Sequence, residues 1–70
     1  MRTDFTAVVK QVDEGWIGWI EEVPGVNCQE PTREELLISL RITLREALEH
    51  NRQEALAAAG SDFREEPIVL

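Results

Sequence analysis

Carboxylate side chains are the most numerous groups in this sequence that could do chemistry, because Asp and Glu make up 14 of its 70 residues. Metal-dependent hydrolysis of a phosphodiester needs several carboxylates that converge on two divalent ions. Asp4 begins an apolar stretch, Asp13-Glu14 lie in a turn, and Glu21-Glu22 end a second apolar stretch. These positions do not direct several carboxylates towards one interior point, where they could hold metal ions. We therefore expect solvated carboxylates, no metal site and no catalytic residue.

The other candidate groups are one histidine and one cysteine. His50 lies on a charged stretch with helical spacing, four residues after Glu46, and a metal site needs several ligands. Cys28 has no second cysteine with which to form a disulfide and no nearby histidine to activate it. The sequence therefore predicts a surface histidine, a cysteine that packs as a small hydrophobic side chain, and no cofactor.

The charge balance bears on the kind of partner. The net charge is −7, Lys10 is the only lysine, and four of the six arginines alternate with glutamates in one stretch of helical spacing. Binding to DNA or RNA requires basic patches that neutralise phosphates, so we expect no direct nucleic-acid partner. An acidic surface steers basic proteins into contact, although solubility alone also explains the charge. No apolar run approaches a membrane span, and we expect a cytoplasmic protein with no membrane contact.

The first half of the chain has the pattern of an antiparallel meander. Residues 3–12 and 16–22 are rich in strand-forming side chains, and the Asp13-Glu14-Gly15 turn joins them as a hairpin. Pro24-Gly25 fits the central positions of a type II turn. A short third strand over residues 26–30 follows, with polar side chains typical of a sheet edge.

The second half has the pattern of one long helix. Thr32 is a natural N-cap with Glu35 three residues later, and Gly60 is a natural residue to end the helix. An apolar stripe with a period of 3.6 residues runs between them: Leu36, Leu37, Leu40, Leu44, Ala47 and Leu48. After a connector, residues 68–70 form a last short strand, with Pro67 tolerated at its first position.

The order of elements predicts an α+β fold over a single domain of residues 1–70. It is a βββαβ fold with an antiparallel three-strand meander, one long crossover helix on one face and a short C-terminal strand. A right-handed crossover places that strand parallel beside the first, which gives the sheet order 3-2-1-4.

The sheet has two apolar faces, whereas one helix covers only one of them. Trp16 and Trp19 point to opposite faces of the second strand, so we expect one in the core and one at an interface, with core packing alone as the alternative. A small domain that exposes an apolar face gains stability by association, which predicts a homodimer or homotetramer. The expected oligomer contacts are Val8, Trp16, Trp19, Ile38 and Ile42.

Four segments together resemble a known family. They are FTAVV at residues 5–9, DEGWI at 13–17, EVPGV at 22–26 and QEPTREE at 29–35. This ordered set resembles the HicB antitoxins over residues 3–48, and the end of the chain looks like the single-domain members. Leu36 stands where the family usually has alanine.

The resemblance implies a partial ribonuclease-H-like fold and a binding function. HicB-like proteins bind and neutralise HicA, a small basic toxin that cleaves messenger RNA, and many carry a further C-terminal DNA-binding domain. We expect no such domain in residues 1–70, which puts transcriptional autorepression in doubt. The expected toxin-binding residues are Trp19, Glu21, Glu22 and Glu30. The alternative is an orphan HicB-like domain that self-assembles and has no toxin partner; an active nuclease is the weakest alternative.

Overall fold

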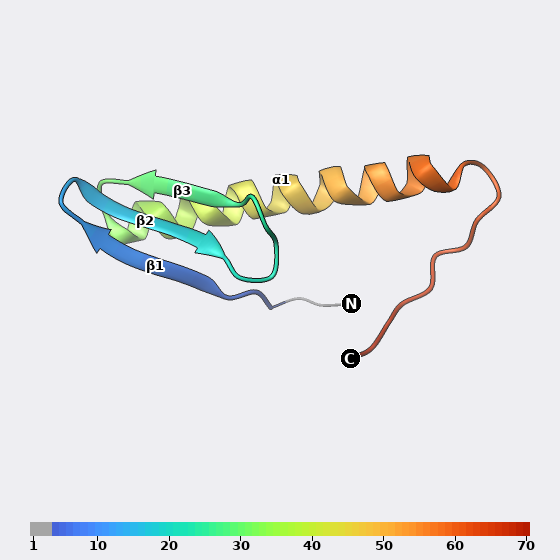
Figure 1. The fold of residues 1–70 in the computed structure, drawn as a ribbon, viewed down its shortest axis with the longest axis horizontal. Coiled ribbons are helices and arrows are strands. Elements are labelled where there is room, and N and C mark those ends of the chain that lie inside the picture. Colours follow the sequence, from blue (N-terminus) through green and yellow to red (C-terminus); the bar gives the residue numbers. More distant parts are fainter. Residues whose placement is uncertain (1–3) are drawn as a thin grey trace.

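Three antiparallel strands and one long helix make up the fold in a computed structural model, which describes residues 4–70 (Figure 1). The strands are β1 (Ala7–Val12), β2 (Gly15–Ile20) and β3 (Asn27–Glu30), and the helix is α1 (Arg33–Ala59). The sheet order is β1-β2-β3, which confirms the α+β class and the predicted meander. The first strand begins at Ala7 and not at residue 3, which lies outside the described residues.

Glycines make the two turns of the meander possible. Gly15 ends the β1–β2 turn with a φ of +142°, and a Cβ added there would stand 2.6 Å from the backbone oxygen of Glu30. Gly25 has a φ of +89°, as the third residue of a type II turn requires. The longer loop that contains this turn is closed by the Ile20 N–H, which donates to the Val26 carbonyl at 3.1 Å. Both predicted turns are therefore confirmed.

The ends of α1 also lie where the sequence predicts them. The Thr32 hydroxyl accepts a hydrogen bond from the Glu35 backbone N–H at 3.1 Å, which satisfies one of the unpaired donors of the first turn. The same hydroxyl donates to the Glu35 carboxylate at 3.2 Å. At the other end, Gly60 adopts a φ of +83° and its N–H donates to the Ala57 carbonyl.

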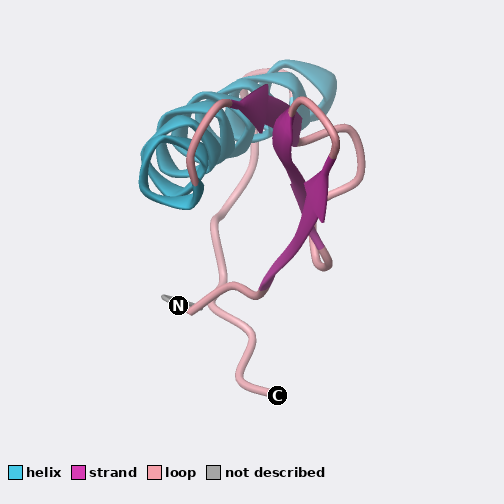
Figure 2. Ribbon diagram, turned by 90° about the vertical axis from the view of Figure 1, so that its left-hand side faces the viewer, coloured by secondary structure: helices cyan, strands magenta, loops and turns pink. Residues whose placement is uncertain are grey.

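The core lies between one face of the sheet and the first half of α1. Figure 2 shows the helix on one side of the sheet only. Gly18 is the point of closest approach, because a Cβ there would stand 3.1 Å from side-chain atoms of both Leu36 and Leu40. The buried side chains of the core are Ile20, Val23, Val26, Leu36 and Leu40.

The second half of α1 extends past the sheet (Figure 1). Ala47 is the last helical residue that packs against the core, and every residue from 48 to 59 except Leu56 is exposed. A helix of 27 residues is about 40 Å long, so roughly 18 Å of it lies beyond Ala47. The molecule is accordingly elongated, with extents of 51 × 23 × 15 Å.

Within the described residues 4–70, residues 68–70 do not form the predicted fourth strand, so the sheet there has the order 3-2-1 without the fourth position. The segment after Gly60 runs back below α1 without forming a strand (Figure 1). Ile68, Val69 and Leu70 are 75%, 89% and 104% exposed. Two physical reasons account for this difference. Pro67 has no N–H to donate to a neighbouring strand, so only three residues remain for the ladder of hydrogen bonds. The helix also ends far beyond the sheet, so the segment that follows it starts away from β1.

Candidate protein-binding surface

The face of the sheet opposite α1 is the first candidate surface. Gly18 and Ile20 are buried under the helix, so strand alternation directs Ile17 and Trp19 to the other side. The register places Val8 of β1 and Asn27 of β3 on either side of Trp19. We call the side chains on this side the outer face: Val8, Lys10, Val12, Ile17, Trp19, Asn27 and Gln29.

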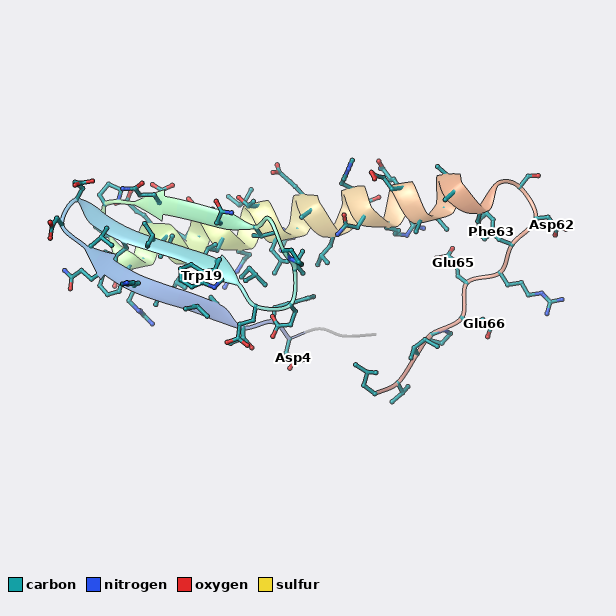
Figure 3. All side chains as sticks on the ribbon, viewed as in Figure 1. Asp4, Trp19, Asp62, Phe63, Glu65 and Glu66 are labelled. Carbon is teal, nitrogen blue, oxygen red and sulfur yellow. The ribbon has the colours of Figure 1, made fainter. Side chains whose placement is uncertain are left out.

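Trp19 is the largest side chain of the outer face and is 42% exposed (Figure 3). Its neighbours Val8 and Ile17 are half-buried, and Asn27 is exposed. An indole surrounded by aliphatic side chains, with polar groups on one rim, has the composition of a binding hot spot. The outer face can therefore dock an apolar side chain of another protein.

Trp16 lies on the covered face of the sheet. It is half-buried and packs against the core cluster beneath α1. Of the two tryptophans, Trp16 is thus the core residue and Trp19 is the exposed one, so Trp16 does not belong to the outer face. The oligomer contacts predicted for Val8, Trp19, Ile38 and Ile42 stay a prediction.

The three glutamates predicted to bind a partner do not lie together. Glu21 is exposed just after β2, and its N–H donates to the Thr6 carbonyl at 2.9 Å. Glu22 is half-buried, and its carboxylate accepts a hydrogen bond from the Thr6 N–H at 2.8 Å. Glu30 is at the opposite end of the sheet, where it accepts a hydrogen bond from the Ser39 hydroxyl at 2.6 Å. Of these three glutamates, Glu21 is the exposed one near Trp19, whereas the carboxylates of Glu22 and Glu30 bind neighbouring segments.

Ile38 and Ile42 form a separate surface. They are 59% and 53% exposed, and they lie one turn apart on α1. Leu36 and Leu40 face the sheet, and two residues along a helix correspond to a rotation of about 200°. The two isoleucines therefore lie on the side of α1 that points away from the sheet, and they cannot form one patch with Val8 and Trp19.

The single histidine and cysteine occupy the environments that the sequence predicts. His50 is exposed, with its Nε2 3.1 Å from a Glu54 carboxylate oxygen one turn later. Cys28 is half-buried and packs on the core, with its Sγ 3.5 Å from the Thr43 hydroxyl. Within residues 4–70, no three His, Cys, Asp or Glu side chains come close enough together to hold a metal ion.

A groove between β1 and α1 is a second candidate surface, which the sequence analysis missed. It has a volume of about 480 Å³, with Phe5, Ala7, Leu37 and Leu44 among its apolar lining. Arg41 and Arg45 also line it, and both belong to the helical stretch in which arginines alternate with glutamates. The helical spacing of Leu37, Arg41, Leu44 and Leu48 was the available signal, because it extends the apolar stripe to one side of Leu36 and Leu40.

The chain matches no protein-family model, no curated protein and no solved structure. Within the described residues, no helix is both long and apolar enough to cross a membrane.

Proposed function

We propose that this chain is an antitoxin-like protein of the HicB type, which binds a small basic RNA-cleaving toxin and neutralises it by covering it. In this proposal both proteins act in the cytoplasm and the chain itself is not an enzyme. The four segments that resemble HicB support the proposal, together with a net charge of −7. The exposure of Trp19 on an uncovered sheet face is the observation that carries it.

The outer face suits a protein partner for two physical reasons. Trp19 lies between two strand neighbours and is 42% exposed, so a partner that covers its exposed part buries apolar area at a small cost in side-chain entropy. Glu21 provides an exposed negative charge beside it. A basic partner is attracted by that charge and by the net charge of the domain.

The first test starts from the adjacent reading frame. The proposal requires a neighbouring gene for a basic protein, which the family resemblance places at roughly 60–90 residues and whose charge complements this domain. The two purified proteins should form a complex in calorimetry, and the complex should not cleave RNA. Trp19→Ala should raise the dissociation constant at least ~10-fold, as expected for a hot-spot residue.

Ile42→Ala is the matched control, because it removes an exposed aliphatic side chain from the far side of α1. It should leave the affinity unchanged. The proposal is wrong if the basic neighbour does not bind, or if Trp19→Ala binds it as tightly as the unmodified chain does.

An orphan domain that self-assembles, with no toxin partner, is the second candidate function. The exposure of Ile68, Val69 and Leu70 favours it, because such an apolar segment is stabilised by burial against another surface. We also propose that residues 68–70 form the fourth strand beside β1, in the order 3-2-1-4, when the domain assembles. Within the described part of the chain, β1 has a neighbouring strand on one side only.

A further inference from the structure

The groove and the C-terminal segment have complementary properties. The groove lies beside Phe5 and Ala7 at the open edge of the sheet, and a smaller hollow of about 250 Å³ continues it to Leu48. The C-terminal segment has three aliphatic residues, Ile68-Val69-Leu70, that are almost fully exposed. An apolar groove and an exposed apolar segment are thus present in the same chain.

We propose that this groove binds residues 68–70 of a second copy of the chain, and that two copies exchange these segments reciprocally. Each copy then donates one strand and receives one, which closes the assembly with two-fold symmetry. This inference extends the fourth-strand proposal by naming the source of the strand, and it does not depend on the existence of a toxin.

The hydrogen-bonding pattern of β1 supports strand addition at this edge. The Glu21 N–H donates to the Thr6 carbonyl, so Thr6 and Glu21 are a hydrogen-bonded pair of the two strands. Along an antiparallel pair of strands, hydrogen-bonded residue pairs alternate with pairs that are not hydrogen-bonded to each other. Residues Val8, Lys10 and Val12 therefore direct their backbone groups to β2. Ala7, Val9 and Gln11 direct theirs to the open edge, where an added strand forms main-chain hydrogen bonds.

The side chains of the added segment alternate in the same way. With Ile68 and Leu70 directed into the groove, towards Phe5 and Leu44, Val69 lies on the outer face of the sheet near Val8. The three aliphatic side chains then all contact apolar surface.

Charge complementarity also points to this segment. Arg41 and Arg45 line the groove, and neither takes part in the ion pairs found among the described residues. Glu65 and Glu66 come just before the apolar segment, on the exposed tail (Figure 3). Asp4 also lines the groove, at its Phe5 end. The two arginines give the groove positive charge that complements the acidic tail.

The position of the segment in the single chain favours a second copy as its binding partner. The helix carries the chain roughly 18 Å past Ala47, and the edge of β1 lies a further ~10 Å across the layers, which gives a diagonal path of about 21 Å. The nine Cα steps from Ala59 to Ile68 span up to about 30–32 Å, so the connector is long enough for this path. The chain's own segment nevertheless lies outside its groove, with Ile68, Val69 and Leu70 75%, 89% and 104% exposed, which leaves the groove accessible to the segment of a second copy.

Sedimentation of the purified full chain at micromolar concentration is the first test. We expect a dimer of the 8.0 kDa chain. Ile68→Glu combined with Leu70→Glu should raise the dimer dissociation constant at least tenfold without unfolding the chain, because both side chains lie outside the core. Ile38→Glu with Ile42→Glu, a matched pair of exposed residues on α1, should leave the dimer intact. A monomer, or a dimer that only the α1 pair dissociates, would overturn the proposal.

The second test distinguishes exchange from docking within one chain. In a Cys28→Ser background, a Val8→Cys chain and a Val69→Cys chain are mixed in a thiol-disulfide buffer. We expect a mixed disulfide between the two chains, and much less of it when Gln29→Cys, at the β3 edge, replaces Val8→Cys. The proposal fails if no mixed disulfide forms, or if the doubly substituted chain yields only an internal disulfide.

Charge reversal tests the role of the arginines. Arg41→Glu with Arg45→Glu should raise the dimer dissociation constant at least tenfold, and adding Glu65→Arg with Glu66→Arg to the same chain should restore much of the affinity. Unchanged dimerisation in the first variant, or no recovery in the second, would contradict the pairing of these charges. All three tests use the chain alone, so a failure to find a toxin does not affect them.

Discussion

Gly18 is the residue on which the packing of helix against sheet depends. A Cβ at this position would stand 2.9 Å from the Val8 backbone oxygen and 3.1 Å from atoms of Leu36 and Leu40. The leucine side chains can move, but the backbone oxygen can shift only with β1. We expect Gly18→Ala to lower the free energy of unfolding by about 1–3 kcal/mol, as overpacking of a core does.

Urea denaturation followed by circular dichroism measures this change. Lys10→Ala is the control on the neighbouring strand, and its exposed side chain should contribute little. A Gly18→Ala variant as stable as the unmodified chain would show that α1 does not approach the sheet this closely.

At the scale of elements, α1 depends on its N-terminal cap because its second half receives no support from the sheet. The Thr32 hydroxyl accepts from the Glu35 N–H, and Leu36 and Leu40 of the following turns are the most buried helical side chains. Thr32→Ala should lower the free energy of unfolding by ~1 kcal/mol, since it leaves that N–H without its partner.

Thr32→Ser keeps the hydroxyl and should retain most of the stability, which separates the loss of the cap from the loss of a methyl group. Thermal unfolding of the three chains under identical conditions gives the comparison. Equal midpoints for the alanine and threonine chains would contradict the role of the cap.

At the scale of the whole molecule, the net charge of −7 should control how fast a basic toxin associates. Steering between opposite charges is screened beyond a Debye length of about 10 Å at 0.1 M salt. We expect the association rate to fall several-fold from low to high salt, and Glu21→Lys to slow it at low salt. Stopped-flow tryptophan fluorescence would follow the reaction, because the partially exposed Trp19 lies on the outer face.

Glu54→Lys is the control, because it changes the net charge equally on the part of α1 that extends beyond the sheet. It should slow association less than Glu21→Lys does, since long-range attraction is partly retained and the outer face is unchanged. Rates that do not depend on salt would contradict an electrostatic encounter.

Local interactions alone account for the features that the sequence determined. Gly15 and Gly25 adopt positive φ in the predicted turns. The hydroxyl of Thr32 caps the start of the helix, and the positive φ of Gly60 ends it. Strand alternation likewise required that Trp16 and Trp19 lie on opposite faces. Each of these features depends on residues close together in the chain, so the sequence specifies them directly.

Contacts between distant segments decided the rest. Only the packing of Leu36 and Leu40 on Gly18 shows that Trp16 is covered and Trp19 exposed. Glu22 and Glu30 were expected to bind a partner protein. Instead, Glu22 accepts a hydrogen bond from Thr6 and Glu30 accepts one from Ser39, because the fold brings these segments together. The β1–α1 groove and the undocked residues 68–70 depend on where the long helix packs across the shorter strands, which the periodicity of each segment by itself does not encode.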